Sequence, residues 1–157
     1  FGEFDEDTIN EGAIQSEMSP EELMEALGPM GSLGDHPILR GREELDEPVK
    51  AIMTFGGSAF LPSAGTQPLF KVAPEGNGAV YTDDIPSEDW PWYPMIGWLV
   101  GGAKEYGEGR VVFMGEAAMC SAQLSGPEQT PMGMNHPLSV DNPRFCLNVV
   151  RWLAGVI

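Results

Sequence analysis

Fifteen residues near the C-terminus, DNPRFCLNVVRWLAG (141–155), place the strongest requirement on the fold. Asn142 suits a helix N-cap, Pro143 suits the first helical position, and Gly155 suits the terminator. The apolar residues between them follow the i, i+3, i+4 spacing of an amphipathic helix: Phe145, Cys146, Val149, Val150, Trp152 and Leu153. Because so wide a stripe needs a broad apolar surface to cover, the pattern predicts a helix packed on a β-sheet.

The strands of that sheet are expected in the middle of the chain. Residues 97–106 and 110–116 read as two strands joined by the turn GEG, which predicts a hairpin. The near-continuous run VVFM within the second strand is typical of an interior, parallel strand buried on both faces. Further strands are expected over 49–55, ending at Gly56-Gly57, over 66–73, placed at an edge by Pro68, and more weakly over 78–84.

The remaining segments are expected to be loops, with one further helix. SPEELMEAL (19–27) combines a capping box with apolar residues at helical spacing and predicts a short helix. Residues 86–95, rich in Pro and Trp, and residues 121–140, rich in Gly, Pro and Met, predict loops. For the aromatic segment Trp90, Trp92 and Tyr93, covering of the core is favoured over carbohydrate stacking or a partner contact.

Size and charge limit the class of protein. The 157 residues suffice for a single core. The formal charge of −16 would repel nucleic acid and anionic membranes, so neither is expected as a partner. Residues 1–47 hold 14 acidic residues against Arg40 and Arg42 alone, a net charge of −12. Two interpretations of this acidic front stand, a docking surface for a cationic partner and a solubilising surface, and the second is favoured.

Nothing in the sequence predicts a membrane span or a signal peptide, so a soluble chain is expected, and the sequence does not indicate its compartment.

The two cysteines, Cys120 and Cys146, are too few for a disulfide framework and lack C-x-x-C spacing, although a single disulfide between them stays open. Neither Gly56-Gly57 nor Gly101-Gly102 opens a helix or carries the Lys-Ser/Thr of a nucleotide site, so no cofactor is expected.

A sheet covered on both faces needs more than the two helices found, at 19–27 and 142–154. Either the chain lacks an N-terminal βα portion, or a second copy covers the exposed face. The sequence therefore predicts a homodimer.

A series of segments in order carries a resemblance: HPILRGR, TFGGSAF, WLVGGAKEYGEGRVVFMGEAAMCSAQ, MGMNHP and DNPRFCLNVVRWLAG. Over roughly residues 35–157 the chain resembles the C-terminal two-thirds of a family of uncharacterised bacterial proteins. Those proteins are similar to the class I glutamine-amidotransferase-like superfamily and to trehalose-utilisation-type proteins. The resemblance implies a flavodoxin-like three-layer α/β/α sandwich that lacks part of its N-terminal half. The expected organisation is an acidic segment over 1–34, with one short helix, and an amidotransferase-like α/β domain over 35–157.

The chain departs from true amidotransferases at the catalytic positions. Those enzymes place a nucleophilic Cys on an elbow in the first half of the domain and a His-x-Glu pair on the final strand. Residues 1–34 contain no such elbow, and MGEAAM has no His two residues before its acid. A complete nucleophile, base and orienting group cannot be assembled, so we expect a non-catalytic binding or assembly domain.

Three residues remain candidates for chemistry if the chain is instead a hydrolase acting on a carbohydrate or amide. Glu116 ends the predicted parallel strand, where α/β sheets bind ligands, and its alternative is a backbone-binding carboxylate. Cys120 would need a neighbouring His, such as His136, to act as a nucleophile, and a buried structural role is favoured. Cys146 is expected in the core.

A small polar ligand pocket is expected above the sheet, lined by Glu116, Ser121, Gln123, Met134 and Asn135, unless the loop closes on its own backbone through Asn135. Glu116, His36 and His136 offer the donor types of an open zinc or iron site but lack diagnostic spacing, so no metal is expected and His36 is assigned to a turn. The third functional hypothesis is an acidic protein-interaction module.

Overall fold

The computed structural model describes residues 33–42, 44–73, 76–79, 89–95 and 97–157. Its described elements form a mixed α/β protein with small antiparallel sheets and few helices. The chain divides into compact units, of which the larger comprises Leu33–Lys71 and Leu99–Ile157 and the smaller includes Val72–Trp98. The helix predicted over 19–27 lies outside the described residues.

Three antiparallel strands form the sheet of the larger unit. Its order is β1 (Gln67–Lys71), β4 (Leu99–Tyr106) and β5 (Gly109–Met114), and Gly107, with φ of 59°, lies in the turn between β4 and β5. Six residue pairs from Gly101–Met114 to Tyr106–Gly109 define the β4–β5 register. The predicted hairpin is therefore confirmed. Among the described strands β1 lies at an edge of this sheet, as Pro68 indicated, and Leu33 forms an isolated antiparallel bridge with Phe70 on its outer side.

The prediction that the VVFM strand is interior and parallel is wrong. Strand β5 runs antiparallel to β4 and lies at the edge of the sheet in the described part of the chain. Phe113 and Met114 are 45% and 38% exposed, so the strand is not buried on both faces. The cause is the turn, because a connection of two residues joins antiparallel strands only, whereas parallel strands need a crossover of a dozen residues or more.

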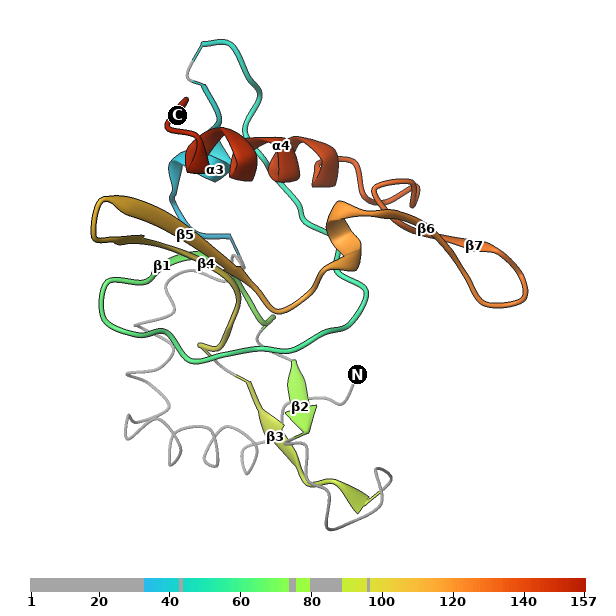
Figure 1. The fold of residues 1–157 in the computed structure, drawn as a ribbon. Helices are drawn as coiled ribbons and strands as arrows, with labels where there is room; N and C mark the ends of the chain where they lie inside the picture. The colour runs from blue at the N-terminus through green and yellow to red at the C-terminus, as the bar shows by residue number, and fades with distance from the viewer. Residues whose placement is uncertain (1–32, 43, 74–75, 80–88, 96) are drawn as a thin grey trace. The chain divides into compact units, whose positions relative to one another are not determined.

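Helix α4 (Asn142–Leu153) covers one face of this sheet, as predicted (Figure 1). Phe145, Val149 and Trp152 enter a core shared with Leu69, Phe70 and Ala103. Phe145 meets Phe70 edge-to-face, with ring centroids 5.7 Å apart. A Cβ on Gly101 would lie 2.2 Å from the Phe70 ring, so the absence of a side chain there makes room for this contact.

The ends of α4 differ slightly from the sequence pattern. The N-cap residue is Asp141, not Asn142, and its side chain makes no capping hydrogen bond. At the C-terminal end Gly155 has φ of 70°, and its N–H donates to the Trp152 carbonyl, which confirms Gly155 as the terminator. The short helix α3 (Pro37–Arg40) packs beside α4.

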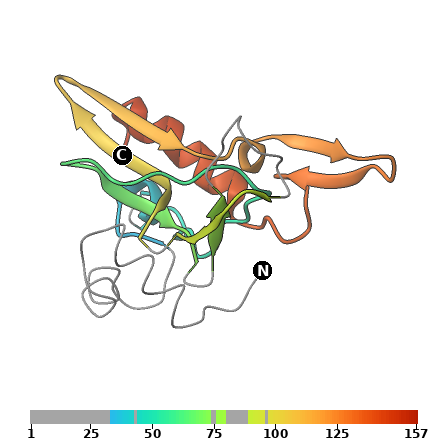
Figure 2. The same cartoon turned by 90° about the horizontal axis from the view of Figure 1, so that it is seen from below.

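Two predictions about loops and strands are corrected. Residues 49–55 form no strand, because their N–H groups bond to side chains at the start of α4 and to the Leu39 carbonyl. Residues 121–140, predicted as a loop, contain strands β6 (Ala122–Ser125) and β7 (Thr130–Gly133), which form an antiparallel hairpin after the 3-10 helix η2 (Ala118–Cys120). This hairpin projects away from the helix and sheet in both ribbon views (Figures 1 and 2).

The smaller unit contains a two-stranded antiparallel sheet of β2 (Asn77–Ala79) and β3 (Trp92–Pro94). Part of the weak strand predicted over 78–84 is thus present, and the aromatic segment predicted as a loop supplies β3. Trp92 is exposed and Pro94 is buried. No helix in the described part of the chain is long and apolar enough to cross a membrane.

Candidate functional site

Glu116 follows β5 and is buried, with 7% of its surface exposed. Its Oε1 accepts from the Ala118 N–H at 2.5 Å and its Oε2 from the Met119 N–H at 3.0 Å. A buried carboxylate needs such donors, and here the backbone of η2 supplies them. Glu116 therefore holds η2 in place, which is the backbone-binding alternative.

Gly57, where the strand predicted over 49–55 was expected to end, packs against the backbone next to Glu116. The Ser58 N–H donates to the Gly115 carbonyl at 2.9 Å, and a Cβ on Gly57 would lie 2.5 Å from that oxygen. Gly57 also has φ of 109°, which L side chains rarely adopt. Gly57 thus permits close contact between two backbone segments at the end of β5.

The hypothesis that Cys120 is a nucleophile is wrong. Cys120 forms a disulfide with Cys146, across a Cα–Cα distance of 5.8 Å, and neither of the chain's two cysteines is free. A sulfur atom in a disulfide cannot serve as a thiolate nucleophile. The single bridge that the sequence left open is therefore present, and it joins η2 to α4.

The two histidines lie in different surroundings. His136 packs edge-to-face on Phe55, with ring centroids 5.5 Å apart, and its Nδ1 accepts from the Leu138 N–H. In the described part of the chain no hydrogen bond or ring contact joins His136 to Glu116 or to Cys120. His136, the base expected beside Glu116 or Cys120, therefore makes no such contact with either of them.

His36 is buried and caps α3, since its Nδ1 accepts from the Ile38 N–H at 3.2 Å. Its ring lies edge-on to Trp152 at 5.0 Å. Burial lowers the pKa of His36, and the nearby Arg40 and Arg110 guanidinium groups lower it further. His36 thus fixes a helix start, in keeping with its assignment to a turn. Among the described residues no three His, Cys, Asp or Glu side chains are grouped to hold a metal.

Four residues of the predicted ligand pocket do come together at the base of the β6–β7 hairpin. The Met134 N–H donates to the Ser121 carbonyl at 2.6 Å, and Gln123 Nε2 donates to Ser121 Oγ at 2.5 Å. Asn135 Nδ2 donates to the Gln123 carbonyl at 3.1 Å. Both side-chain amides therefore bond to their own loop, as in the alternative in which the loop closes through Asn135.

Two polar residues at the start of α4 have a role that the sequence did not indicate. Asp141 Oδ2 accepts from the N–H groups of Lys50 and Ala51, at 2.8 and 3.2 Å. Asn142 bonds through its side chain to both the N–H and the carbonyl of Met53, at 2.9 and 2.8 Å. Asn142 Nδ2 also donates to the Met119 carbonyl. These side chains attach segment 50–53 and η2 to α4.

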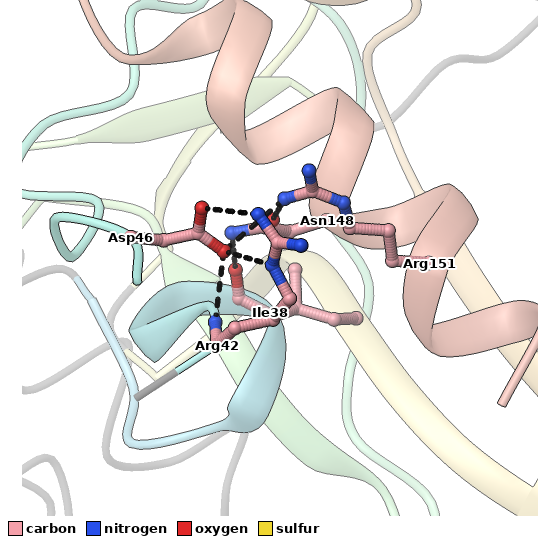
Figure 3. A network of polar contacts seen from close by, with 5 residues as sticks. All are labelled: Ile38, Arg42, Asp46, Asn148 and Arg151. Carbon is pink, nitrogen blue, oxygen red and sulfur yellow. Dashed lines mark hydrogen bonds and ion pairs between the residues drawn. The ribbon is translucent and has the colours of Figure 1, made fainter. Parts of the chain in front are cut away.

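A second polar cluster was also missed and lies between α3 and α4 (Figure 3). Asp46 accepts from the Arg42 N–H at 3.0 Å and from both Arg42 and Arg151 guanidinium groups. These hydrogen bonds from Arg42 hold the pKa of the Asp46 carboxyl well below its ordinary value. Asn148 Nδ2 donates to the Ile38 carbonyl at 3.0 Å. Every member bonds within the cluster, which makes it a clamp between two helices.

The outer face of α4 is the apolar surface that these contacts leave uncovered. Leu147, Val150 and Leu153 are 49%, 62% and 46% exposed, although the opposite face of the helix is buried. Leu138 and Val140, in the segment that leads into α4, are exposed as well. We call Leu147, Val150 and Leu153 the outer face of α4. Large exposed apolar surfaces of this kind often mark contacts with other proteins.

Comparison of the chain with protein-family models, with curated proteins and with solved structures finds no match.

Proposed function

We propose that this chain is a non-catalytic assembly domain that associates with a second copy of itself through the outer face of α4. The observation that carries the proposal is the exposure of Leu147, Val150 and Leu153 on a helix whose other face forms the core. Removing such side chains from water stabilises association by about 25 cal/mol per Å² of apolar surface, before the cost of lost freedom is subtracted.

The charge distribution favours a second copy as the partner. Residues 1–116 carry 22 acidic and six basic residues, a net charge of −16, whereas residues 117–157 carry two of each. Two copies of so acidic a chain repel one another over most of their length. They can approach most easily through α4, which contains no acidic residue and whose two arginines, Arg144 and Arg151, pair with Asp141 and Asp46 beside it.

The non-catalytic part of the proposal is supported by what the candidate residues already bind. The Cys120 sulfur is joined to Cys146, the Glu116 carboxylate accepts two backbone N–H groups, and His136 packs on Phe55. A nucleophile, a base and an orienting group must contact one another to act. No observation favours the hydrolase alternative or a small-ligand pocket over this assembly role.

Membership of the amidotransferase-like proteins, and with it a flavodoxin-like three-layer fold, is retained as a proposal that rests on the sequence resemblance. The terminal helix over one face of the sheet supports it. The antiparallel pairing of β1, β4 and β5 counts against it, because flavodoxin-like sheets are built from parallel strands.

Sedimentation velocity of the oxidised chain tests the assembly role. We expect concentration-dependent self-association of the wild type and a lower weight-average mass for the double variant Leu147→Glu with Val150→Glu at the same concentration, because the added charges would be buried against one another. Leu61→Glu is the matched control, since it adds charge at another exposed leucine and should leave the dimer intact. A wild type that stays monomeric at high concentration, or a weight-average mass that the double variant leaves unchanged, would overturn the proposal.

A further inference from the structure

Among the described residues, the β6–β7 hairpin has no neighbouring strand that extends its sheet. It contains two strands of four residues, and neither is paired with a third strand in the described part of the chain. Residues 122–131 are all exposed, and Leu124 is 57% exposed. A two-stranded hairpin alone is marginally stable in water. The hairpin projects from the helix and sheet (Figure 2).

The two outer edges of the hairpin differ in their ability to accept a further strand. β7 contains Pro131, which has no N–H to donate to a neighbouring strand. β6, with the sequence AQLS, has neither a proline nor a charge. Natural proteins protect exposed edge strands with charged residues or proline, and β6 has neither. The outer edge of β6 is therefore open to strand pairing.

The base of the hairpin holds this edge in a fixed position. The Met134 N–H donates to the Ser121 carbonyl just beyond the ladder, and Asn135 Nδ2 donates to the Gln123 carbonyl within β6. The Cys120–Cys146 disulfide then ties the preceding residue to α4. A strand edge that is held in place loses less conformational freedom on binding than a disordered segment does.

We propose that β6 pairs antiparallel with β6 of a second copy, which joins two hairpins into one four-stranded sheet about a two-fold axis. This inference rests on the assembly role proposed above but uses a surface separate from the outer face of α4. A second copy is the partner because residues 117–140 contain one charged residue, Glu128, which lies in the hairpin turn. The paired strands therefore meet without the repulsion that opposes self-association elsewhere, and the two-fold axis makes the contact self-complementary.

Cysteine cross-linking tests this pairing in the full chain, whose native cysteines are already joined to each other. Directly opposite residues of antiparallel strands have Cα atoms about 4.5–5.5 Å apart, which is within the range that a disulfide spans. We therefore expect Gln123→Cys or Leu124→Cys to form a covalent dimer on mild oxidation with diamide. Peptide mapping should show the new cysteine joined to its own counterpart, with the native bridge intact.

Thr130→Cys is the matched control because Thr130 is exposed on the same hairpin but lies on β7. At least a tenfold lower yield of covalent dimer is expected for this control. Equal yields from the two strands, or no cross-link from β6 above that of the control, would overturn the proposal. In a second measurement, Leu124→Lys should lower the weight-average mass in sedimentation, and Thr130→Lys should not.

Repeating the cross-linking in the Leu147→Glu, Val150→Glu background separates the two contacts. Cross-linking through β6 in a chain whose mass those two substitutions leave unchanged would refute the α4 contact and support the β6 contact. Dissociation by the α4 substitutions, without any β6 cross-link above the control, would support the α4 contact and refute the β6 contact.

Discussion

Both faces of α4 carry apolar residues, but only one of the two faces is buried. Phe145, Val149 and Trp152 on the inner face are buried in the core, whereas Leu147, Val150 and Leu153 on the outer face are exposed. A surface helix normally places polar residues on its outer side. The apolar surface of α4 therefore extends beyond the face that packs on the sheet, and the self-association proposed above would bury the remainder.

The largest effect is expected from Phe145→Ala on the inner face. Phe145 is fully buried and meets Phe70 edge-to-face, so its removal leaves a cavity between α4 and β1. The free energy of unfolding should fall by about 3–5 kcal/mol, as measured by urea denaturation. Phe145→Leu fills part of the same space and should cost clearly less. Equal losses for the two variants would mean that the inner face is loosely packed.

The disulfide at the border between the two faces should have the next largest effect. Cys120 and Cys146 are 26 residues apart, and a cross-link over a loop of this length stabilises a fold by about 3–4 kcal/mol in the chain-entropy model. Urea denaturation of the oxidised chain, of the chain reduced with dithiothreitol, and of the variant Cys120→Ala with Cys146→Ala measures this contribution. The reduced chain and the variant should agree with each other. An oxidised chain no more stable than either would contradict the assignment of the bridge.

A pH-dependent effect is expected where α3 meets the inner face. Burial and the facing Arg40 and Arg110 lower the pKa of His36, and Asp35 opposes them, so the folded state favours neutral His36. The contribution of neutral His36 to the free energy of unfolding is therefore complete above the pKa of His36 in the unfolded chain, about 6.5. It is lost as the pH falls from there through the lower pKa of His36 in the folded chain. Protonation removes the acceptor that caps α3, which costs about 0.5–2 kcal/mol.

Urea denaturation between pH 7 and pH 5 measures this loss. His36→Asn keeps a capping side chain but does not titrate, so its stability should be nearly flat over that range. Asp46 does not interfere because its pKa is also lowered, and its contribution is lost only as the pH falls below about 3.8. A wild type as flat as His36→Asn would show that His36 is not held neutral.

Local sequence patterns correctly predicted one helix and one hairpin, both of which depend only on residues close together in the chain. The helix over 142–153 follows from its apolar spacing, Pro143 and Gly155, and the β4–β5 hairpin follows from its short glycine turn. The helical stripe, however, included Val150 and Leu153 with Phe145 and Trp152. Spacing alone identifies the apolar residues of a helix but not which of them the core of the same chain buries, because exposed and buried positions of a helix can carry the same side chains.

Local sequence patterns could not predict contacts between segments that are far apart in the chain. The strand predicted over 49–55 is an extended segment bound by Asp141 and Asn142, about 90 residues away. Apolar runs cannot distinguish backbone partners of this kind from a neighbouring strand. The cysteine bridge likewise depends on where η2 meets α4. Glu116 follows a strand, as predicted, but the strand is antiparallel and ends at Met114. The partners of its carboxylate are the next backbone N–H groups, which spacing does not reveal.

Substitutions on the outer face of α4 should have the smallest effect on folding. They test most directly whether the inner and outer faces of α4 have different roles. Leu147→Ala and Val150→Ala remove exposed side chains, so at concentrations where the chain is monomeric the unfolding free energy should change by less than about 0.5 kcal/mol. Under dimer-forming conditions the same variants should weaken association in sedimentation, because the lost methyl groups are buried only there. A loss of monomer stability as large as that of Phe145→Ala would mean that this face is already packed within one chain, and α4 would then have a single role.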